Sequence, residues 1–150
     1  MSGYLDDDAA NAEVFKDGWL HTGDLLRREE DGTLTFVDRK KYLIKTGGEN
    51  VYPAEVEAVL SRHPAVQEAC VFGVPDAHWG ETIKAVVVLR EGQSADSAEI
   101  LHWCRARLAG YKRPRYLQFM RSEELPRSTT GKLQRHELAG LPLTAEQRVG

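Results

Sequence analysis

The chain has 150 residues, of which 41% are hydrophobic and 29% are charged, and its formal net charge at pH 7 is −3. This length and composition predict a soluble globular protein with one substantial hydrophobic core. The small negative charge and a sequence pI near 6.0 do not favour general binding to nucleic acid or to an anionic membrane surface. No apolar stretch approaches the roughly 20 residues that span a bilayer, and the N-terminus lacks the pattern of a signal peptide, so we expect a cytoplasmic protein.

The first part of the chain has little apolar periodicity. Residues 1–37 contain a Gly-Trp turn and a predicted hairpin around Asp31-Gly32. A segment of this kind needs neighbours to bury it, so we interpret it as the end of something larger.

A regular pattern begins at Asp38, with a strand predicted through 42–45 and then a Gly-Gly loop. Pro53 begins a helix, because a missing N–H costs least in the first helical turn, and Pro64 ends it. One face of this helix contains Val56, Val59, Leu60 and His63.

Two valine-rich segments, 66–74 and 82–89, predict strands that pair antiparallel. A second helix should start near Asp96, which caps it while Glu99 reaches back, and Gly110 should end it in the left-handed conformation. Its apolar stripe contains Ile100, Leu101, Cys104 and Leu108. With Cys70, Cys104 is expected to be a reduced, buried thiol, since neither has metal-type spacing.

The last third predicts a strand over 115–120, a loop over 125–132 and a helix over about 133–138. Residues 140–150 have no periodicity and are expected to be loose. Strands interleaved with helices, including one antiparallel hairpin, predict an α+β fold: a small mixed or antiparallel sheet with helices packed on it.

Three motifs stand in a fixed order along the chain. They are Gly18-Trp-Leu-His-Thr-Gly-Asp24, Asp38-Arg-Lys-Lys-Tyr-Leu-Ile-Lys-Thr-Gly-Gly-Glu-Asn-Val-Tyr-Pro53 and Pro126-Arg-Ser-Thr-Thr-Gly-Lys132. Together they resemble the C-terminal part of the adenylate-forming acyl-CoA synthetases, the AMP-dependent synthetases and ligases. The resemblance implies that 1–37 is the end of a large N-terminal adenylation domain, 38–45 a hinge, 46–139 the C-terminal lid domain and 140–150 a loose tail.

The resemblance also implies an activity. The full enzyme would be an acid-thiol ligase that converts a carboxylic acid and ATP to acyl-AMP and pyrophosphate, and then acyl-AMP and CoA to acyl-CoA and AMP. ATP and Mg²⁺ would be bound mainly by the missing N-terminal domain, with CoA as co-substrate, and this chain alone is expected to be inactive. Two alternatives stay open: the lid of an adenylation domain that loads a carrier protein, and a free-standing binding or regulatory module with the lid fold.

Lys132 is the candidate catalytic residue for adenylation. That step brings two anions together, and a compact, mobile ammonium can bridge them. Gly131 should make the loop flexible, and Pro126 should hold its base. The alternative is a solvated surface lysine. The run is not a phosphate-cradling P-loop, because the first glycine is absent and Leu133 replaces the required Ser or Thr.

Four further candidates come from the same resemblance. Asp24 would hold the ribose hydroxyls of the nucleotide, with Arg39 as a second contact. Lys41 would be the hinge pivot, within a charged run whose backbone can change conformation without breaking a core. Lys45 is a candidate for the thioester-forming half-reaction.

Gly47, Gly48 and Glu49 are the predicted CoA and pantetheine site. Glycines let a ligand approach the backbone, and their free amides can donate to it; a simple tight turn is the alternative. Lys112 and Arg113 could meet CoA phosphates or lie in a solvent-facing linker. The histidines show no metal spacing, and no metal site is expected within the chain.

Overall fold

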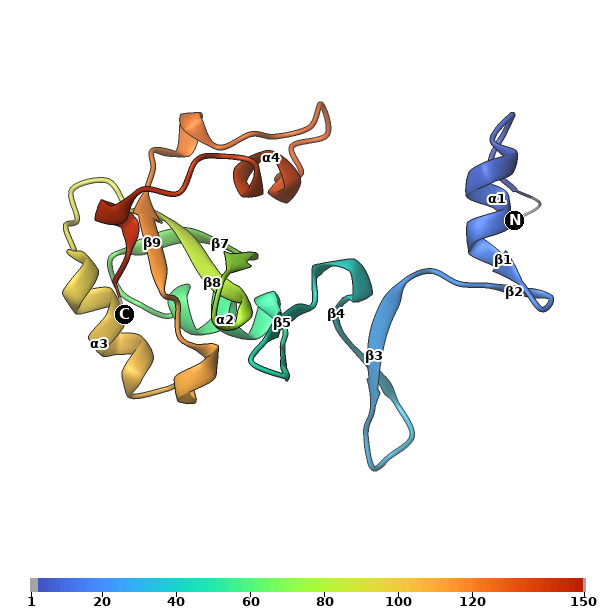
Figure 1. Ribbon diagram of the computed structural model, residues 1–150, viewed down its shortest axis with the longest axis horizontal. Coiled ribbons are helices and arrows are strands. Elements are labelled where there is room, and N and C mark those ends of the chain that lie inside the picture. The colour runs from blue at the N-terminus through green and yellow to red at the C-terminus, as the bar shows by residue number, and fades with distance from the viewer. Residues whose placement is uncertain (1–2, 150) are drawn as a thin grey trace. The chain divides into compact units, whose positions relative to one another are not determined.

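The computed structural model describes residues 3–149 (Figure 1). The chain divides into two compact units, Met1–Lys41 and Tyr42–Gly150. The division falls directly after Lys41, the predicted pivot. None of the helices formed by residues 3–149 is both long and apolar enough to cross a membrane.

The first unit combines one helix with two short hairpins. The helix α1 begins after Asp7, whose carboxylate accepts a hydrogen bond from the Ala10 N–H, and it buries none of its residues. Large apolar side chains on the hairpins are exposed, Trp19 by 74% and Leu34 by 62%. This unit therefore has little core of its own. Its elements are α1 (Asp8–Val14), β1 (Phe15–Lys16), β2 (Trp19–Leu20), β3 (Asp24–Arg28) and β4 (Leu34–Arg39).

The second unit is built on a five-stranded sheet. The two valine-rich strands β7 and β8 pair antiparallel, as predicted, and β9 pairs with β8 in parallel. The hairpin β5–β6 joins the sheet through the pair Thr46 and Gly80. This mixed sheet confirms the predicted α+β fold class. The strands are β5 (Ile44–Thr46), β6 (Glu49–Val51), β7 (Val66–Asp76), β8 (Gly80–Leu89) and β9 (Tyr116–Phe119).

Helices cover both faces of this sheet (Figure 1). The strand β8 lies between β7 and β9, and its residues Thr82–Val88 are all buried, as a nearly continuous apolar strand requires. On one face, Ile83, Ala85 and Val87 pack against α2 and α3. On the other, Val86 and Val88 pack with Leu125 and Leu138. The helical segments are α2 (Pro53–Leu60), α3 (Ser97–Arg105), α4 (Arg135–Ala139) and the short 3₁₀ turns η1 (Lys40–Tyr42), η2 (Gly110–Lys112), η3 (Ser122–Glu124) and η4 (Ala145–Gln147).

The predicted starts of α2 and α3 are confirmed, α4 starts at Arg135 instead of at about 133, and the predicted end of α3 is wrong. Pro53 is the first residue of α2, and the Asp96 carboxylate caps α3 by accepting from the Glu99 N–H at 2.8 Å. The helix α3 ends at Arg105, and Gly110 begins η2 without a positive φ. Near this end the Arg107 N–H donates to the Cys104 carbonyl, three residues back, at 3.0 Å, the 3₁₀-type bond that tightens the last turn of a helix.

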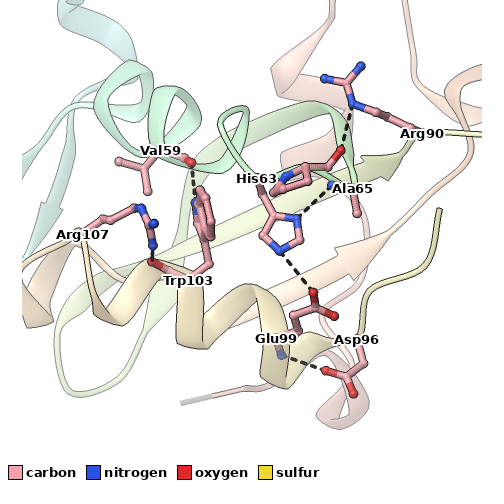
Figure 2. A network of polar contacts seen from close by, with 9 residues as sticks. Val59, His63, Ala65, Arg90, Asp96, Glu99, Trp103 and Arg107 are labelled. Carbon is pink, nitrogen blue, oxygen red and sulfur yellow. Dashed lines mark hydrogen bonds and ion pairs between the residues drawn. The ribbon is translucent and has the colours of Figure 1, made fainter.

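A polar network ties α2 to α3 (Figure 2). His63 lies beyond the end of α2, is 4% exposed and accepts from the Ala65 N–H through Nδ1. Its Nε2 lies 3.5 Å from a Glu99 carboxylate oxygen. The Glu99 carboxylate therefore contacts His63 and does not reach back to the capping residue Asp96 as predicted. Trp103 donates its indole N–H to the Val59 carbonyl at 2.9 Å. These contacts satisfy polar groups that the packing of the two helices would otherwise leave buried and unpaired.

Residues 147–149 are held against the domain, which corrects the prediction of a loose tail for this part of the C-terminal segment, while residues 140–146 are exposed. Arg148 forms an antiparallel bridge with Tyr116, and the Val149 N–H donates to the Arg115 carbonyl at 2.8 Å. Lys84, which is fully buried on β8, donates from Nζ to Gln147 Oε1 at 3.0 Å. A buried ammonium needs an acceptor, and the tail supplies one.

The predicted strand over 42–45 is displaced. Lys40–Tyr42 form η1, and the strand β5 covers Ile44–Thr46. Within the predicted hinge, Asp38 and Ile44 are buried while Arg39, Lys40 and Lys41 are exposed. The exposed part of the predicted hinge is therefore shorter than the charged run suggests.

Candidate functional site

The Lys132 segment is an ordered miniature hairpin, which corrects the prediction of a flexible loop. The Gly131 N–H donates to the Ser128 carbonyl, and the Ser128 N–H donates to the Lys132 carbonyl, both at 2.8 Å. Gly131 has φ +80°, the left-handed conformation that follows a tight turn in a three-residue hairpin. Glycine is needed at that position because a side chain would strain the backbone.

Both sides of this hairpin are anchored to the rest of the second unit. Arg127 donates from Nη2 to the Glu68 carboxylate on β7 and from Nη1 to the Gly131 carbonyl at 3.2 Å. Arg135, three residues after Lys132, donates from Nη2 to both Glu57 carboxylate oxygens at 2.7 Å. The backbone around Lys132 is thus held at both ends.

The side chain of Lys132 is exposed. Among the described residues, no carboxylate forms an ion pair with it and no acceptor receives a hydrogen bond from its ammonium. An anchored backbone that carries a free cation can present that cation to an anionic ligand.

Asp24 and Arg39 face each other across the β3–β4 hairpin. They are register partners, and Arg39 Nε lies 2.8 Å from Asp24 Oδ1. That contact is an ion pair and not a hydrogen bond. Oδ1 is shielded from solvent and receives no hydrogen bond from the described residues. The two residues line a cleft of about 820 Å³ within the first unit, together with Thr22, Gly23 and Lys41 among others. The Asp24 side chain is 26% exposed, so its carboxylate can accept from a hydroxyl donor that enters this cleft.

Gly47 and Gly48 form the two-residue turn of the β5–β6 hairpin. Both have positive φ, +58° and +86°, as a type I′ turn requires. The Gly47 N–H donates to the Trp79 carbonyl at 3.0 Å, and a β-carbon at this position would lie 2.6 Å from the Trp79 ring. The expectation of a free amide at Gly47 is therefore wrong, because Trp79 already occupies both that donor and the open side of the glycine.

Gly48 differs from its neighbour. No heavy atom would lie within 4 Å of a β-carbon there, and Glu49 beside it is exposed. Lys45 is also exposed, while its backbone N–H donates to the Glu81 carboxylate at 2.8 Å. The open surface of this turn is thus formed by Gly48, Glu49 and the Lys45 side chain.

Lys112 and Arg113 make contacts within the domain. The Lys112 ammonium lies 2.7 Å from the Glu55 carboxylate, and Arg113 donates to the carbonyls of Leu108 and Arg105. These contacts favour a structural role over the predicted CoA contact.

Sequence reasoning missed Glu57, Glu68, Arg127 and Arg135. The two arginines stand within or next to the Lys132 motif, which is a weak local signal. Their partners lie 59 and 78 residues away, and no local pattern identifies them.

The geometry and the motifs agree with a known class of domain. The family model of the AMP-binding enzyme C-terminal domain matches residues 55–132, which is 78 of the 150 residues. The chain therefore belongs to this family, as the three motifs predicted.

Several characterised relatives are similar over nearly the whole chain. A feruloyl-CoA synthase from an Amycolatopsis species is 47% identical over 92% of this chain and 28% of its own length. The structure of the o-succinylbenzoate CoA synthetase of Bacillus subtilis, in complex with an acyl-adenylate intermediate, is 42% identical, with a TM-score of 0.85 over 95% of this chain and 28% of that chain. An amide bond synthetase from Marinactinospora thermotolerans is 38% identical, with a TM-score of 0.82 over 92% of this chain and 28% of that chain. The chain thus spans little more than a quarter of these proteins.

Proposed function

We propose that this chain is the C-terminal lid of an ATP-dependent acyl- or aryl-CoA ligase. The observation that carries the proposal is the exposed, unpaired Lys132 ammonium on a hairpin anchored at both ends. Family membership and the similarity to CoA ligases support it. The residues 1–37, 38–45 and 46–139 then serve as the end of the adenylation domain, the hinge and the lid.

In the first half-reaction, a carboxylate oxygen of the acid attacks the α-phosphorus of ATP, and the bond to the pyrophosphate oxygen breaks. Negative charge shifts from the entering carboxylate to the leaving pyrophosphate while both share one phosphorus. Lys132 supplies a positive charge at that point, and such preorganised charge is typically worth several kcal/mol. The Asp24 carboxylate accepts from a ribose hydroxyl, and Arg39 holds that carboxylate in place.

In the second half-reaction, the CoA thiol first loses its proton to solvent, the thiolate sulfur attacks the acyl carbonyl carbon, and AMP leaves with the electrons of the carbon–oxygen bond. The proposal places Gly48 and Glu49 beside the pantetheine arm and Lys45 near the reacting groups. Rotation about Lys41 exchanges the Lys132 and Gly48 surfaces at the active centre. The Mg²⁺ that accompanies ATP is assigned mainly to the N-terminal domain, and residues 3–149 contain no cluster of three metal-ligating side chains.

A different acyl acceptor is the second candidate. The similarity to an amide bond synthetase is almost as high as that to the CoA synthetase, so the lid fold does not by itself select a thiol. A carrier protein is the third acceptor to compare. A free-standing binding module is disfavoured by the large exposed side chains of the first unit.

The test uses a chimera in which this chain replaces the matching C-terminal segment of the Bacillus subtilis o-succinylbenzoate CoA synthetase. Adenylation is measured as the release of pyrophosphate. Thioester formation is measured separately, starting from preformed acyl adenylate. Lys132→Ala should reduce adenylation by about 10²–10³-fold and affect the second step much less. Equal losses in both assays, or a wild-type chimera that cannot adenylate, would contradict the proposal.

The CoA side of the proposal is tested with Gly48→Leu. This change should slow thioester formation and spare pyrophosphate exchange. Gly92→Leu is the matched control, because Gly92 has a similar positive φ and an equally open surface. If Gly48→Leu lowers pyrophosphate exchange by the same factor, Gly48 is only a turn residue. Replacing CoA by an amine or a carrier protein in the same chimera identifies the acceptor.

A further inference from the structure

We infer that Arg127 is a positioning residue for Lys132 and that it acts through Glu68. The inference rests on the proposed role of Lys132 in adenylation. Arg127 lies on the first side of the hairpin, where it bridges to Leu133 on the other side. Its guanidinium reaches in two directions, to the Glu68 carboxylate on β7 and to the carbonyl of Gly131.

These two contacts join the turn directly to the sheet. Gly131 immediately precedes Lys132, so a bond to its carbonyl restrains the peptide from which the lysine projects. Arginine is suited to this bridge because its planar group holds several donors in a fixed arrangement. Hydrogen bonds that involve a charged group are also stronger than neutral ones.

Glu68 is well placed to hold the bridge. It lies on β7, which forms ten register pairs with β8 in the centre of the domain. The described residues give the Glu68 carboxylate one ion-pair partner, Arg127. The effect of Glu68 on the hairpin therefore passes through that arginine.

The second anchor of the hairpin, the Arg135–Glu57 pair, is less suited to a mutational test. The Glu57 carboxylate accepts hydrogen bonds from Arg135 and from the Val71 N–H, the latter at 2.8 Å. The side chains of Arg135 and Glu57 are both about four-fifths buried. Removing one partner of a buried pair strongly destabilises a fold. The Arg127–Glu68 pair is about one-third exposed on each side, so it can be broken while the domain stays folded.

Restraining the backbone matters for the proposed chemistry. Catalytic groups must be held close to their productive geometry, and a displacement of about 1 Å can reduce a rate by roughly 10²-fold. A long lysine side chain on a moving turn would sample many positions. Arg127 reduces that range without touching the reacting atoms.

The first experiment measures amide hydrogen exchange in the 150-residue chain. Arg127→Ala should accelerate exchange at Ser128, Gly131 and Lys132 by about tenfold, the effect of losing one hydrogen bond from a charged donor. The midpoint of thermal unfolding should change little, because the pair is partly solvated. Arg121→Ala is the control, since it breaks an exposed ion pair with Glu124 in the same domain and should leave these three amides unchanged. Unchanged exchange in Arg127→Ala would overturn the inference.

The second experiment uses the chimera and separates this inference from the proposed function. Arg127→Ala should lower the kcat of adenylation by about tenfold or more and spare thioester formation from acyl adenylate. Glu68→Ala should cause a similar loss, and the double variant should lose no more than Arg127→Ala alone, because two residues that act through one contact are not additive. Additive losses would overturn the coupling. Faster exchange with unchanged adenylation would overturn the positioning role of Arg127 and would leave the proposed role of Lys132, which Lys132→Ala tests, unaffected.

Discussion

The ring of Trp79 fills the space where a β-carbon on Gly47 would lie. That carbon would stand 2.6 Å from Trp79 Cε3, and the Gly47 N–H donates to the Trp79 carbonyl. The turn between β5 and β6 is thereby fixed to the connection between β7 and β8. Gly48, one residue later, has an open surface instead.

The two glycines should differ in their effect on stability. Both have positive φ, so an alanine at either position costs about 1–2 kcal/mol of backbone strain. Gly47→Ala also collides with Trp79 and should lose about 1–3 kcal/mol more. Urea unfolding of the two single variants measures the difference. The double variant Gly47→Ala/Trp79→Ala should show less than the sum of the single losses, and strict additivity would contradict the packing explanation.

Lys84 should lower the stability of the fold at neutral pH. Burial lowers its pKa from the ordinary value of 10.5, so below 10.5 there is a window in which the unfolded chain binds more protons than the folded one. The free energy of unfolding contributed by this group therefore rises with pH in that window. Lys84→Met should raise stability at pH 7 by about 1 kcal/mol or more, since a desolvated ammonium is removed.

The measurement is urea unfolding at pH 7 and pH 10. Lys84→Met should remove part of the increase in stability between the two values. Lys132→Met, which replaces an exposed lysine, is the matched control and should leave the free energy of unfolding unchanged at both pH values. A loss of stability in Lys84→Met would show that the Gln147 contact outweighs the cost of burial.

Cys70 and Cys104 should resist alkylation in the native protein. Both are free and buried, and burial raises the pKa of Cys70 from 9.0 to about 12, with a contribution from Glu57, and that of Cys104 to about 11. At pH 8 only about one thiol in 10³ or fewer is ionised, and the thiolate is the reactive form. Iodoacetamide labelling followed by mass spectrometry should find Cys104 faster than Cys70 and both far slower than in urea.

The same thiols predict a loss of stability in alkali. Because their folded pKa values are raised, their contribution is fully present below about pH 9 and is lost as the pH rises towards 11–12. Cys70→Ala/Cys104→Ala should flatten this part of the pH profile. Native labelling at the rate of a free thiol would contradict both statements.

The isolated chain should bind nucleotide weakly. Asp24 and Arg39 provide one edge of a ribose site, and affinity depends on many contacts made together. Calorimetric titration of the 150-residue chain with ATP and Mg²⁺ should show a Kd weaker than the order of 10 μM, which corresponds to about 7 kcal/mol. A tighter Kd that is lost in Asp24→Ala would favour the free-standing binding module.

Short-range patterns were sufficient for most elements of the sheet domain. Pro53 and Asp96 mark helix starts because proline and a capping carboxylate act within one turn. The strands β7 and β8 follow from runs of β-branched residues. The motif around Lys132 likewise identified the candidate lysine, since the motif residues are adjacent in the chain.

The sequence by itself thus determined the family, the α+β class and the candidate positions Asp24, Lys45 and Lys132. Only the tertiary structure decided what holds the Lys132 hairpin and the C-terminal segment, because Arg127–Glu68, Arg135–Glu57 and Lys84–Gln147 join residues 59, 78 and 63 positions apart. Such pairs form where the folded chain brings elements together, and neither propensity nor periodicity specifies them. The ordered tail and the anchored hairpin were therefore mistaken for loose segments: their partners lie on β8, β7 and α2.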